Sequence, residues 1–316
     1  MDMLINIVLL VVGFVLLIKG ADVFVDGASK LAAKLHVPQI VIGLTIVAFG
    51  TSAPEAAVSI ASAFKGTAGI AIGNIIGSNI CNVLLILGMS GVIGLLAVKK
   101  NTFRYETPFV IVISIVLLLL GHFGNGISRL DGVILWIFFL GFLFYLYRLT
   151  KKGEDTAVDD VPELTEKDRV WKMILMIVIG LVAIVFGSQI TIDGASGIAK
   201  EFGVSDRVIG LTIVAIGTSL PELVTSVMAS RKGKNDIAIG NIIGSNIFNI
   251  LFVLGTAALV APNAIPFDPA FLIDGIISIA AIVLFLAFVA RKKQLPKWGA
   301  AIMLASYIGY MIYVIL

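Results

Sequence analysis

The chain contains an internal duplication that preserves two polar segments within apolar sequence. VIGLTIVAFGTSAPE at 41–55 recurs as VIGLTIVAIGTSLPE at 208–222, and AIGNIIGSNICN at 71–82 recurs as AIGNIIGSNIFN at 238–249. One offset of 167 residues relates both pairs, without a gap between Asp26 (matched by Asp193) and Asn82 (matched by Asn249). The chain is therefore expected to fold as two related halves that each supply the same polar groups.

The remaining sequence is apolar enough to require a membrane. Hydrophobic residues make up 59% of the chain, charged residues 14%, and mean hydropathy is +1.07, whereas a soluble domain carries about 25% charged residues. Apolar runs long enough to cross a hydrocarbon core of about 30 Å recur in both halves. The sequence predicts an all-α membrane protein with ten transmembrane helices, at about 3–19, 39–64, 70–98, 105–121, 130–148, 170–190, 207–230, 237–260, 271–290 and 298–316.

The number of spans in each half sets how the halves are related. We predict a first five-helix repeat at 1–150, a polar linker at 151–169 and a second five-helix repeat at 170–316. Because five is odd, the second copy enters the membrane from the opposite side, which makes the repeats inverted. Most Lys and Arg residues then lie on one side, which the positive-inside rule assigns to the cytoplasm. We expect a multi-pass cell-membrane protein with extracytoplasmic termini and a cytoplasmic linker. The basic pI of about 8.9 reflects this bias, so no nucleic-acid partner is needed to explain it.

Each GTS-x-PE segment is expected to break a membrane helix. Proline has no amide hydrogen, so Pro54 deprives the Gly50 carbonyl of its helical partner, and Pro221 does the same to Gly217. Free carbonyls at membrane depth must pair with other groups, water or a cation, so broken helices occur where they line a site. The side chains beside the breaks all offer oxygen atoms: Thr51, Ser52 and Glu55 in the first copy, and Thr218, Ser219 and Glu222 in the second.

The GN-x-xGSN segments supply a second polar surface. Residues at i, i+4 and i+8 share one face of a helix. The resulting stripes are Asn74, Ser78 and Asn82, and Asn241, Ser245 and Asn249. Two glycine pairs, Gly73 with Gly77 and Gly240 with Gly244, present small faces that let helices approach closely. These polar residues could alternatively hold helices together without binding a ligand, and for the glycine pairs both interpretations stay open.

Glu55 and Glu222 are the residues that helix packing explains least. A carboxylate at membrane depth is costly, and no Lys or Arg occurs at a comparable depth to pair with either one. A cation bound between the two carboxylates accounts for both. The all-oxygen set suits a hard divalent ion, and calcium tolerates irregular shells whereas magnesium resists dehydration. Zinc or copper would require His or Cys ligands, and the single Cys81 is expected to be a core residue.

Both motif pairs, in ten spans split five and five, resemble the sodium/calcium exchanger family of the cation/calcium antiporter superfamily. The resemblance covers the whole chain. It implies secondary active exchange of sodium for calcium by alternating access, with the ions bound at the membrane midplane. It also implies that the long first and sixth helices, expected to continue to about Leu35 and Phe202, slide to switch the exposure of the site.

The resemblance further implies which residues bind which ion. Calcium would be held by Glu55, Glu222, Thr51 and Thr218. Sodium, or a shell shared by both ions, would add Ser52, Ser78, Asn82, Ser219, Ser245, Asn249 and the carbonyls of Ala48 and Ala215. The two ions are transported substrates, so no resident cofactor is expected, and no obligatory protein partner is evident.

One position departs from the family pattern. The second GN-x-xGSN segment ends in Asp in well-known exchangers, whereas it ends in Asn249 here. The site then carries at most two negative charges. Two sodium ions would neutralise it and three would leave one positive charge, so the residues leave the sodium:calcium ratio open.

Two other functions could use the same residues. A calcium/proton antiporter would use the two glutamates as proton carriers, but that sibling branch favours an acid within its GN-type segment, and 74–79 contains none. Sodium dependence of calcium uptake separates the two antiporters. An intramembrane enzyme could use the glutamates as acid and base, but no His, Cys or Lys nucleophile accompanies them, so a non-enzymatic transporter is favoured. Lys19 is expected to pair with Asp22 or to extend toward the membrane interface.

Overall fold

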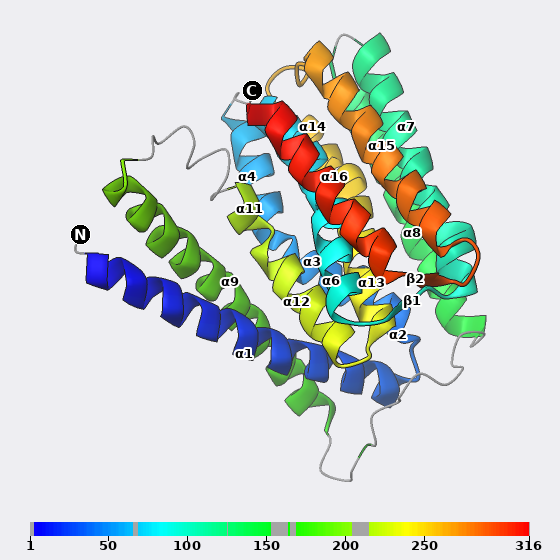
Figure 1. Cartoon of the computed structure of the whole chain (residues 1–316). Coiled ribbons are helices and arrows are strands. Elements are labelled where there is room, and N and C mark those ends of the chain that lie inside the picture. The colour runs from blue at the N-terminus through cyan, green and yellow to red at the C-terminus, as the bar shows by residue number, and fades with distance from the viewer. Residues whose placement is uncertain are drawn as a thin grey trace.

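The structure, a computed structural model, describes residues 3–65, 69–124, 126–152, 164, 169–203 and 215–315. The start of the seventh predicted span, 207–214, and nearly all of the predicted linker lie outside these residues. The described part is mostly helical (Figure 1).

The helical segments follow the predicted spans closely. Those of the first half are α1 (Met3–Leu35), α2 (Gln39–Ile42), η1 (Gly43–Val47), α3 (Ala48–Thr51), α4 (Ala53–Phe64), α5 (Gly69–Ile80), η2 (Cys81–Ile86), α6 (Leu87–Ile93), η3 (Thr102–Glu106), α7 (Thr107–Phe123) and α8 (Arg129–Lys152), where η marks a π-helix. Those of the second half are α9 (Val170–Glu201), α11 (Ala215–Thr218), α12 (Leu220–Arg231), α13 (Asn235–Phe248), η5 (Asn249–Leu254), α14 (Gly255–Val260), α15 (Pro269–Val289) and α16 (Lys297–Ile315). Two short strands, β1 (Leu96–Ala97) and β2 (Gln294–Leu295), pair antiparallel with Leu96 opposite Leu295.

Within the described residues, seven helical segments are long and apolar enough to cross a membrane. They are Met3–Leu35, Gly69–Ile93, Thr102–Phe123, Arg129–Lys151, Val170–Glu201, Asn235–Val260 and Pro269–Val289. The bent pair Gln39–Thr51 and Ala53–Phe64, which meets at 54°, qualifies when its two parts are taken together. A multi-pass helical membrane architecture is therefore present.

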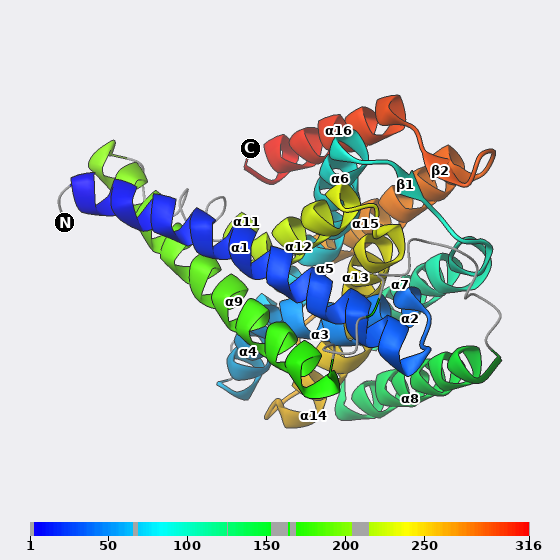
Figure 2. The same ribbon diagram turned by 90° about the horizontal axis from the view of Figure 1, so that it is seen from below.

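α1 and α9 form an antiparallel pair that extends away from the rest of the bundle (Figures 1 and 2). Gly13 packs against Gly187, and Gly20 packs against Gly180. A Cβ atom on Gly20 would come within 2.9 Å of the Gly180 carbonyl oxygen, so only residues without side chains allow this approach. The pair continues to Leu35 in α1 and Glu201 in α9, which confirms the predicted extension of both helices.

α13 lies at the centre of the packing and holds the broken helix of the first half. Every residue of α13 from Asp236 to Phe248 is buried. Gly240 contacts Gly43 of η1, where an added Cβ would lie 2.9 Å from the Gly43 Cα, and Gly244 contacts α3 at Ala48. The close approach predicted for the second glycine pair is thus present. For Gly77 of the first pair, no described atom lies within 4 Å of an added Cβ.

Candidate cation-binding site

Both GTS-x-PE segments break their helices at the serine, as predicted. α3 ends at Thr51, Ser52 has φ −82° and ψ 6°, and α4 carries Pro54 in its first turn. The second copy repeats this geometry, with Ser219 at φ −91° and ψ 6° between α11 and α12. The glutamates lie in the first turns of α4 and α12, where the positive end of the helix dipole stabilises a carboxylate.

Glu55 and Glu222 are buried together and linked across the two halves. Their exposed fractions are 2% and 1%. Ser52 Oγ donates a hydrogen bond to Glu222 Oε1 at 2.8 Å, and Ser219 Oγ donates one to Glu55 Oε1 at 3.4 Å. Each Oε2 atom is buried and has no hydrogen-bond partner among the described residues. Each carboxylate therefore keeps one oxygen available to a ligand, and an orphaned buried oxygen of this kind requires an explanation.

The first asparagine of each GN-x-xGSN segment supports the adjacent broken helix. Asn74 Nδ2 donates to the Glu55 carbonyl at 3.4 Å and to Ser59 Oγ at 2.9 Å. Asn241 Nδ2 makes the equivalent bonds, to the Glu222 carbonyl at 3.3 Å and to the hydroxyl oxygen of Ser226 at 2.9 Å. These asparagines therefore position the glutamate-bearing turns, as the first members of the two predicted stripes.

Asn241 also ties the site to the break in the opposite half. Its Oδ1 atom accepts a hydrogen bond at 2.9 Å from Thr51 Oγ1. Thr51 is itself fully buried, so its hydroxyl lies inside the protein beside the break. The break of α3 and α4 is thereby joined to α13 by a buried polar contact.

Asn82 and Asn249 form a second linked pair between the halves. Asn82 Nδ2 donates to Asn246 Oδ1 at 3.0 Å, and Asn249 Nδ2 donates to Asn79 Oδ1 at 3.2 Å. Asn82 and Asn249 are each 1% exposed, and their Oδ1 atoms lack a partner among the described residues. Asn82 lies in η2 and Asn249 begins η5, and π-helical turns occur frequently at functional sites.

The Nδ2 atoms of Asn82 and Asn249 thus anchor the two side chains, while the Oδ1 atoms remain available to a ligand. Sequence reasoning missed Asn79 and Asn246 as the anchors. Their repetition in both copies was the signal that could have identified them.

The other predicted ligands occupy a range of environments. Ser78 and Ser245 are buried, and Ser245 Oγ has no partner among the described residues. The Ala48 carbonyl already accepts a backbone hydrogen bond from Ser52 at 3.0 Å. Thr218 ends α11 and is partly buried. Ala215 begins α11, and its side chain lies outside the described atoms.

The carbonyl freed by Pro221 has a partner that sequence reasoning missed. Ser188 Oγ, on α9, donates a hydrogen bond to the Gly217 carbonyl at 2.7 Å. The position of the first half that corresponds to Ser188 is Ala21, which has no hydroxyl. The two breaks therefore share a backbone geometry but differ in how the freed carbonyl is satisfied. The predicted free carbonyl was the signal that a donor had to be found.

The charge of the site comes from the two glutamates alone. Among the described residues, no group of three or more His, Cys, Asp or Glu side chains could hold a metal ion. The remaining oxygens, from hydroxyls and amides, are neutral. Two carboxylates completed by neutral oxygens form a donor set that suits one hard divalent cation.

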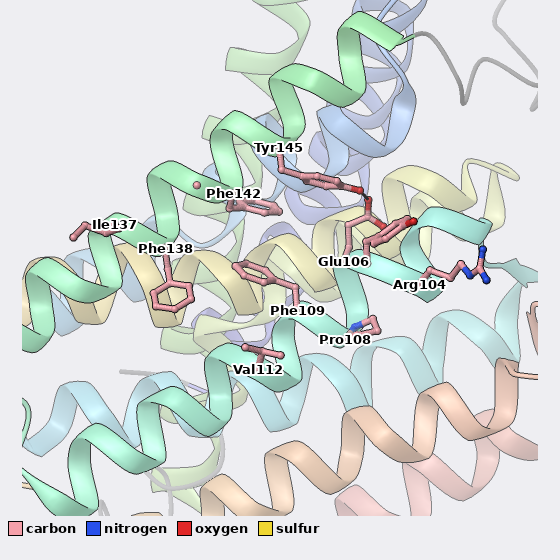
Figure 3. A pocket seen from close by; sticks show the side chains of 11 residues that line it. Arg104, Glu106, Pro108, Phe109, Val112, Ile137, Phe138, Phe142 and Tyr145 are labelled. Carbon is pink, nitrogen blue, oxygen red and sulfur yellow. Dashed lines mark hydrogen bonds between the residues drawn. The ribbon is translucent and has the colours of Figure 1, made fainter.

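A second buried carboxylate lies in a different environment. Glu106 lines a cavity of about 570 Å³ between α7 and α8, together with aromatic side chains that include Phe109, Phe138 and Phe142 (Figure 3). The Tyr145 hydroxyl donates a hydrogen bond to its carboxylate. The cavity offers mostly apolar atoms, so this region lacks the oxygen-rich surroundings of Glu55 and Glu222.

Comparison with known proteins agrees with this geometry. The profile of the family described as "Sodium/calcium exchanger protein" matches residues 5–148 and 172–316. Inner membrane protein YrbG of Escherichia coli (strain K12) is 35% identical over 98% of this chain and 96% of its own length. Sodium/calcium exchanger MaX1 of Methanosarcina acetivorans is 32% identical, with 98% of each chain covered.

A solved structure shares the fold. The sodium-calcium exchanger NCX_Mj, soaked with zero Na⁺ and Ca²⁺, superposes with a TM-score of 0.84 at 32% identity, covering 99% of this chain and 100% of that chain. Profile, sequence and fold thus agree over nearly the whole length. The chain belongs to the sodium/calcium exchanger protein family.

Proposed function

We propose that this protein exchanges sodium for calcium across the cell membrane by alternating access, at the site between the two broken helices. One observation carries the proposal. Two buried carboxylates from equivalent positions are bound by each other's serine, and each keeps an oxygen without a partner among the described residues. A carboxylate oxygen at membrane depth without a hydrogen-bond partner or a bound cation is costly in free energy. Family membership, and relatives named as sodium/calcium exchangers, support the choice of ions.

The proposed ligands are those that the family resemblance implies, and the partnerless Oε2 atoms of Glu55 and Glu222 among the described residues support them. Glu55 and Glu222 neutralise one calcium ion, with hydroxyls from Thr51 and Thr218 beside them. Sodium uses the same carboxylates and adds neutral oxygens. These come from Ser52, Ser78, Asn82, Ser219, Ser245, Asn249 and the carbonyls of Ala48 and Ala215. Competition for two shared charges couples the ions, because calcium and sodium cannot occupy the carboxylates together.

We further propose ten spans arranged as two inverted repeats, 1–150 and 170–316, joined by the linker 151–169. The α1–α9 contacts support this arrangement. At the offset of 167 residues, Gly13 corresponds to Gly180 and Gly187 corresponds to Gly20, so the Gly13–Gly187 contact and the Gly20–Gly180 contact are equivalent. Two pairings of connecting segments add support. Leu96 pairs with Leu295, next to α16. The 167-residue offset relates positions 96 and 295 to positions 263 and 128, and Ile127 pairs with Ile265 close to these positions. The distribution of Lys and Arg supports extracytoplasmic termini and a cytoplasmic linker.

Calcium flux in proteoliposomes tests the proposal. Vesicles loaded with sodium are diluted into sodium-free buffer containing radioactive calcium, with membrane potential clamped by potassium and valinomycin. Uptake is expected to require internal sodium and to exceed equilibrium with the external calcium. Choline-loaded vesicles with an imposed pH gradient form the control. Uptake driven by that gradient without sodium would contradict the proposal and identify a calcium/proton antiporter.

A further inference from the structure

Lys232 connects the end of α12 to α1 through two ion pairs. Its Nζ atom lies 2.6 Å from Asp22 Oδ1 and 2.7 Å from Asp26 Oδ1, and it also donates to the Asp22 carbonyl at 3.1 Å. The two aspartates lie one turn apart on α1, which packs alongside α12 (Figures 1 and 2). Of the two expectations for Lys19, the structure supports outward extension over pairing with Asp22, since Lys19 is exposed and Asp22 pairs with Lys232.

These contacts stabilise the protonated, positively charged form of Lys232. Partial burial alone would lower the pKa of its ammonium group. Hydrogen bonds and attraction from Asp22 and Asp26 outweigh that effect and raise the pKa above its ordinary value. The Lys232 ammonium group therefore keeps its positive charge at physiological pH.

The duplication supplies two of these three groups a second time. At the offset of 167 residues, Lys65 corresponds to Lys232, Asp193 to Asp26, and Gln189 to Asp22. Lys65 follows α4 as Lys232 follows α12. Within the described part of the chain Lys65 is exposed and makes no ion pair, and Asp193 accepts a hydrogen bond from Gln189 at 3.0 Å instead. The second set is present but not engaged.

Helix packing is also more extensive around Lys232 than around Lys65. α1 packs along α12, but the equivalent packing of α9 along α4 is marginal at most. Beside Gly217, a cavity of about 260 Å³ lies between α9, α1 and α11, lined partly by Thr191 and Leu220. The two equivalent glycines do not themselves distinguish the sides, since an added Cβ would lie 3.2 Å from Leu181 at Gly50 and 2.3 Å from Ile192 at Gly217. Among the described residues, α1 and α12 are therefore joined by packing and by the Lys232 ion pairs, whereas α4 and α9 are not joined in this way.

We propose that Lys232 with Asp22 and Asp26, and Lys65 with Asp193, form two alternating ion-pair latches on opposite faces of the transporter. This inference rests on the proposed alternating access. Inverted repeats reach the opposite-facing state when the two halves exchange conformations. In that state Lys65 binds Asp193 and holds α9 against α4, while Lys232 releases α1. Because Gln189 replaces a second carboxylate, the Lys65 latch is the weaker of the two, which favours the conformation seen here.

The accessibility of one introduced cysteine tests the latches. In a Cys81→Ala background, Ala195→Cys places a thiol beside the open cavity. Its alkylation by a polar maleimide is measured in detergent micelles without sodium or calcium, where the reagent reaches both faces. Lys232→Met should slow alkylation about two- to tenfold, because exposed ion pairs each shift a conformational equilibrium by a small factor. Lys65→Met should leave the rate unchanged or raise it.

The controls separate a latch from a local packing effect. Arg231→Met removes the same charge from the exposed neighbour of Lys232 and should leave the rate unchanged. Asp26→Asn should act in the same direction as Lys232→Met, and the exchanged pair Lys232→Asp with Asp26→Lys should restore the original rate. Equal rates for Lys232→Met and Arg231→Met, or no restoration by the exchanged pair, would overturn the proposal.

Flux measurements on the same variants keep this inference distinct from the proposed function. Loss of sodium-driven calcium uptake in the unmodified chain, with the accessibility changes intact, would refute the exchange and leave the latches standing. Normal exchange with unchanged accessibility in Lys232→Met would refute the latches alone.

Discussion

Replacing Glu222 by glutamine should remove calcium binding without unfolding the protein. Glutamine keeps the shape of the side chain, and its carbonyl oxygen can still accept the hydrogen bond that Ser52 donates to Oε1. The position of Oε2, which has no partner among the described residues, becomes an amide that offers donors instead of lone pairs. The site loses one of its two charges and gains a group that repels a cation.

The size of the effect follows from the burial of Glu222, which is 1% exposed. Removing one partner of a buried charge interaction costs about 3–5 kcal/mol. At about 1.4 kcal/mol for each factor of ten, the Kd for calcium should rise by about 100- to 4,000-fold. Glu55→Gln should give a similar loss, because Glu55 occupies the equivalent position and is 2% exposed.

Calcium titration of the purified protein by calorimetry measures this Kd, and thermal unfolding in detergent reports whether the variant is folded. Glu106→Gln is the matched control, because it removes a carboxylate that is also 1% exposed but is bound by Tyr145 away from the site. It should leave the Kd unchanged. A folded Glu222→Gln protein whose Kd lies within tenfold of the original would refute the reasoning.

Two further predictions address packing and charge. Gly240→Ala should destabilise the protein by about 1–3 kcal/mol, because the new Cβ would lie 2.9 Å from the Gly43 backbone. Thermal unfolding measures this loss of stability. Gly309→Ala is the control and should change stability little, because an added Cβ there meets no described atom within 4 Å. Asn249→Asp adds a third carboxylate to the proposed shell, so more positive charge should accompany the bound sodium in each cycle. The reversal potential of exchange in voltage-clamped proteoliposomes measures this charge, and an unchanged value would remove Asn249 from the shell.

The local features of the site could be predicted because they have local causes. Proline lacks an amide hydrogen wherever it occurs, so the breaks near Pro54 and Pro221 follow from composition and spacing. The close approach at Gly240 follows from the absence of a side chain. Glu55 and Glu222 stand out because an unpaired carboxylate at membrane depth requires a compensating ligand.

The partners of these groups could not be predicted in the same way. Ser188 reaches the Gly217 carbonyl only because α9 packs beside α11. Spacing along one helix offered Asp22 as a partner for Lys19, whereas the actual partner of Asp22 lies 210 positions away at Lys232. Long-range contacts depend on how helices pack, which spacing along one helix does not encode.

The sequence by itself determined that two apolar halves carry the same break, the same acid and the same amide stripe, because each of these depends on residue type and short spacing. The tertiary structure alone decided that each serine binds the opposite half's glutamate. It also decided that Lys232 is bound while its twin Lys65 is not. The two lysines differ in this way because helix packing gives them different neighbours: α12 packs along α1, which carries Asp22 and Asp26.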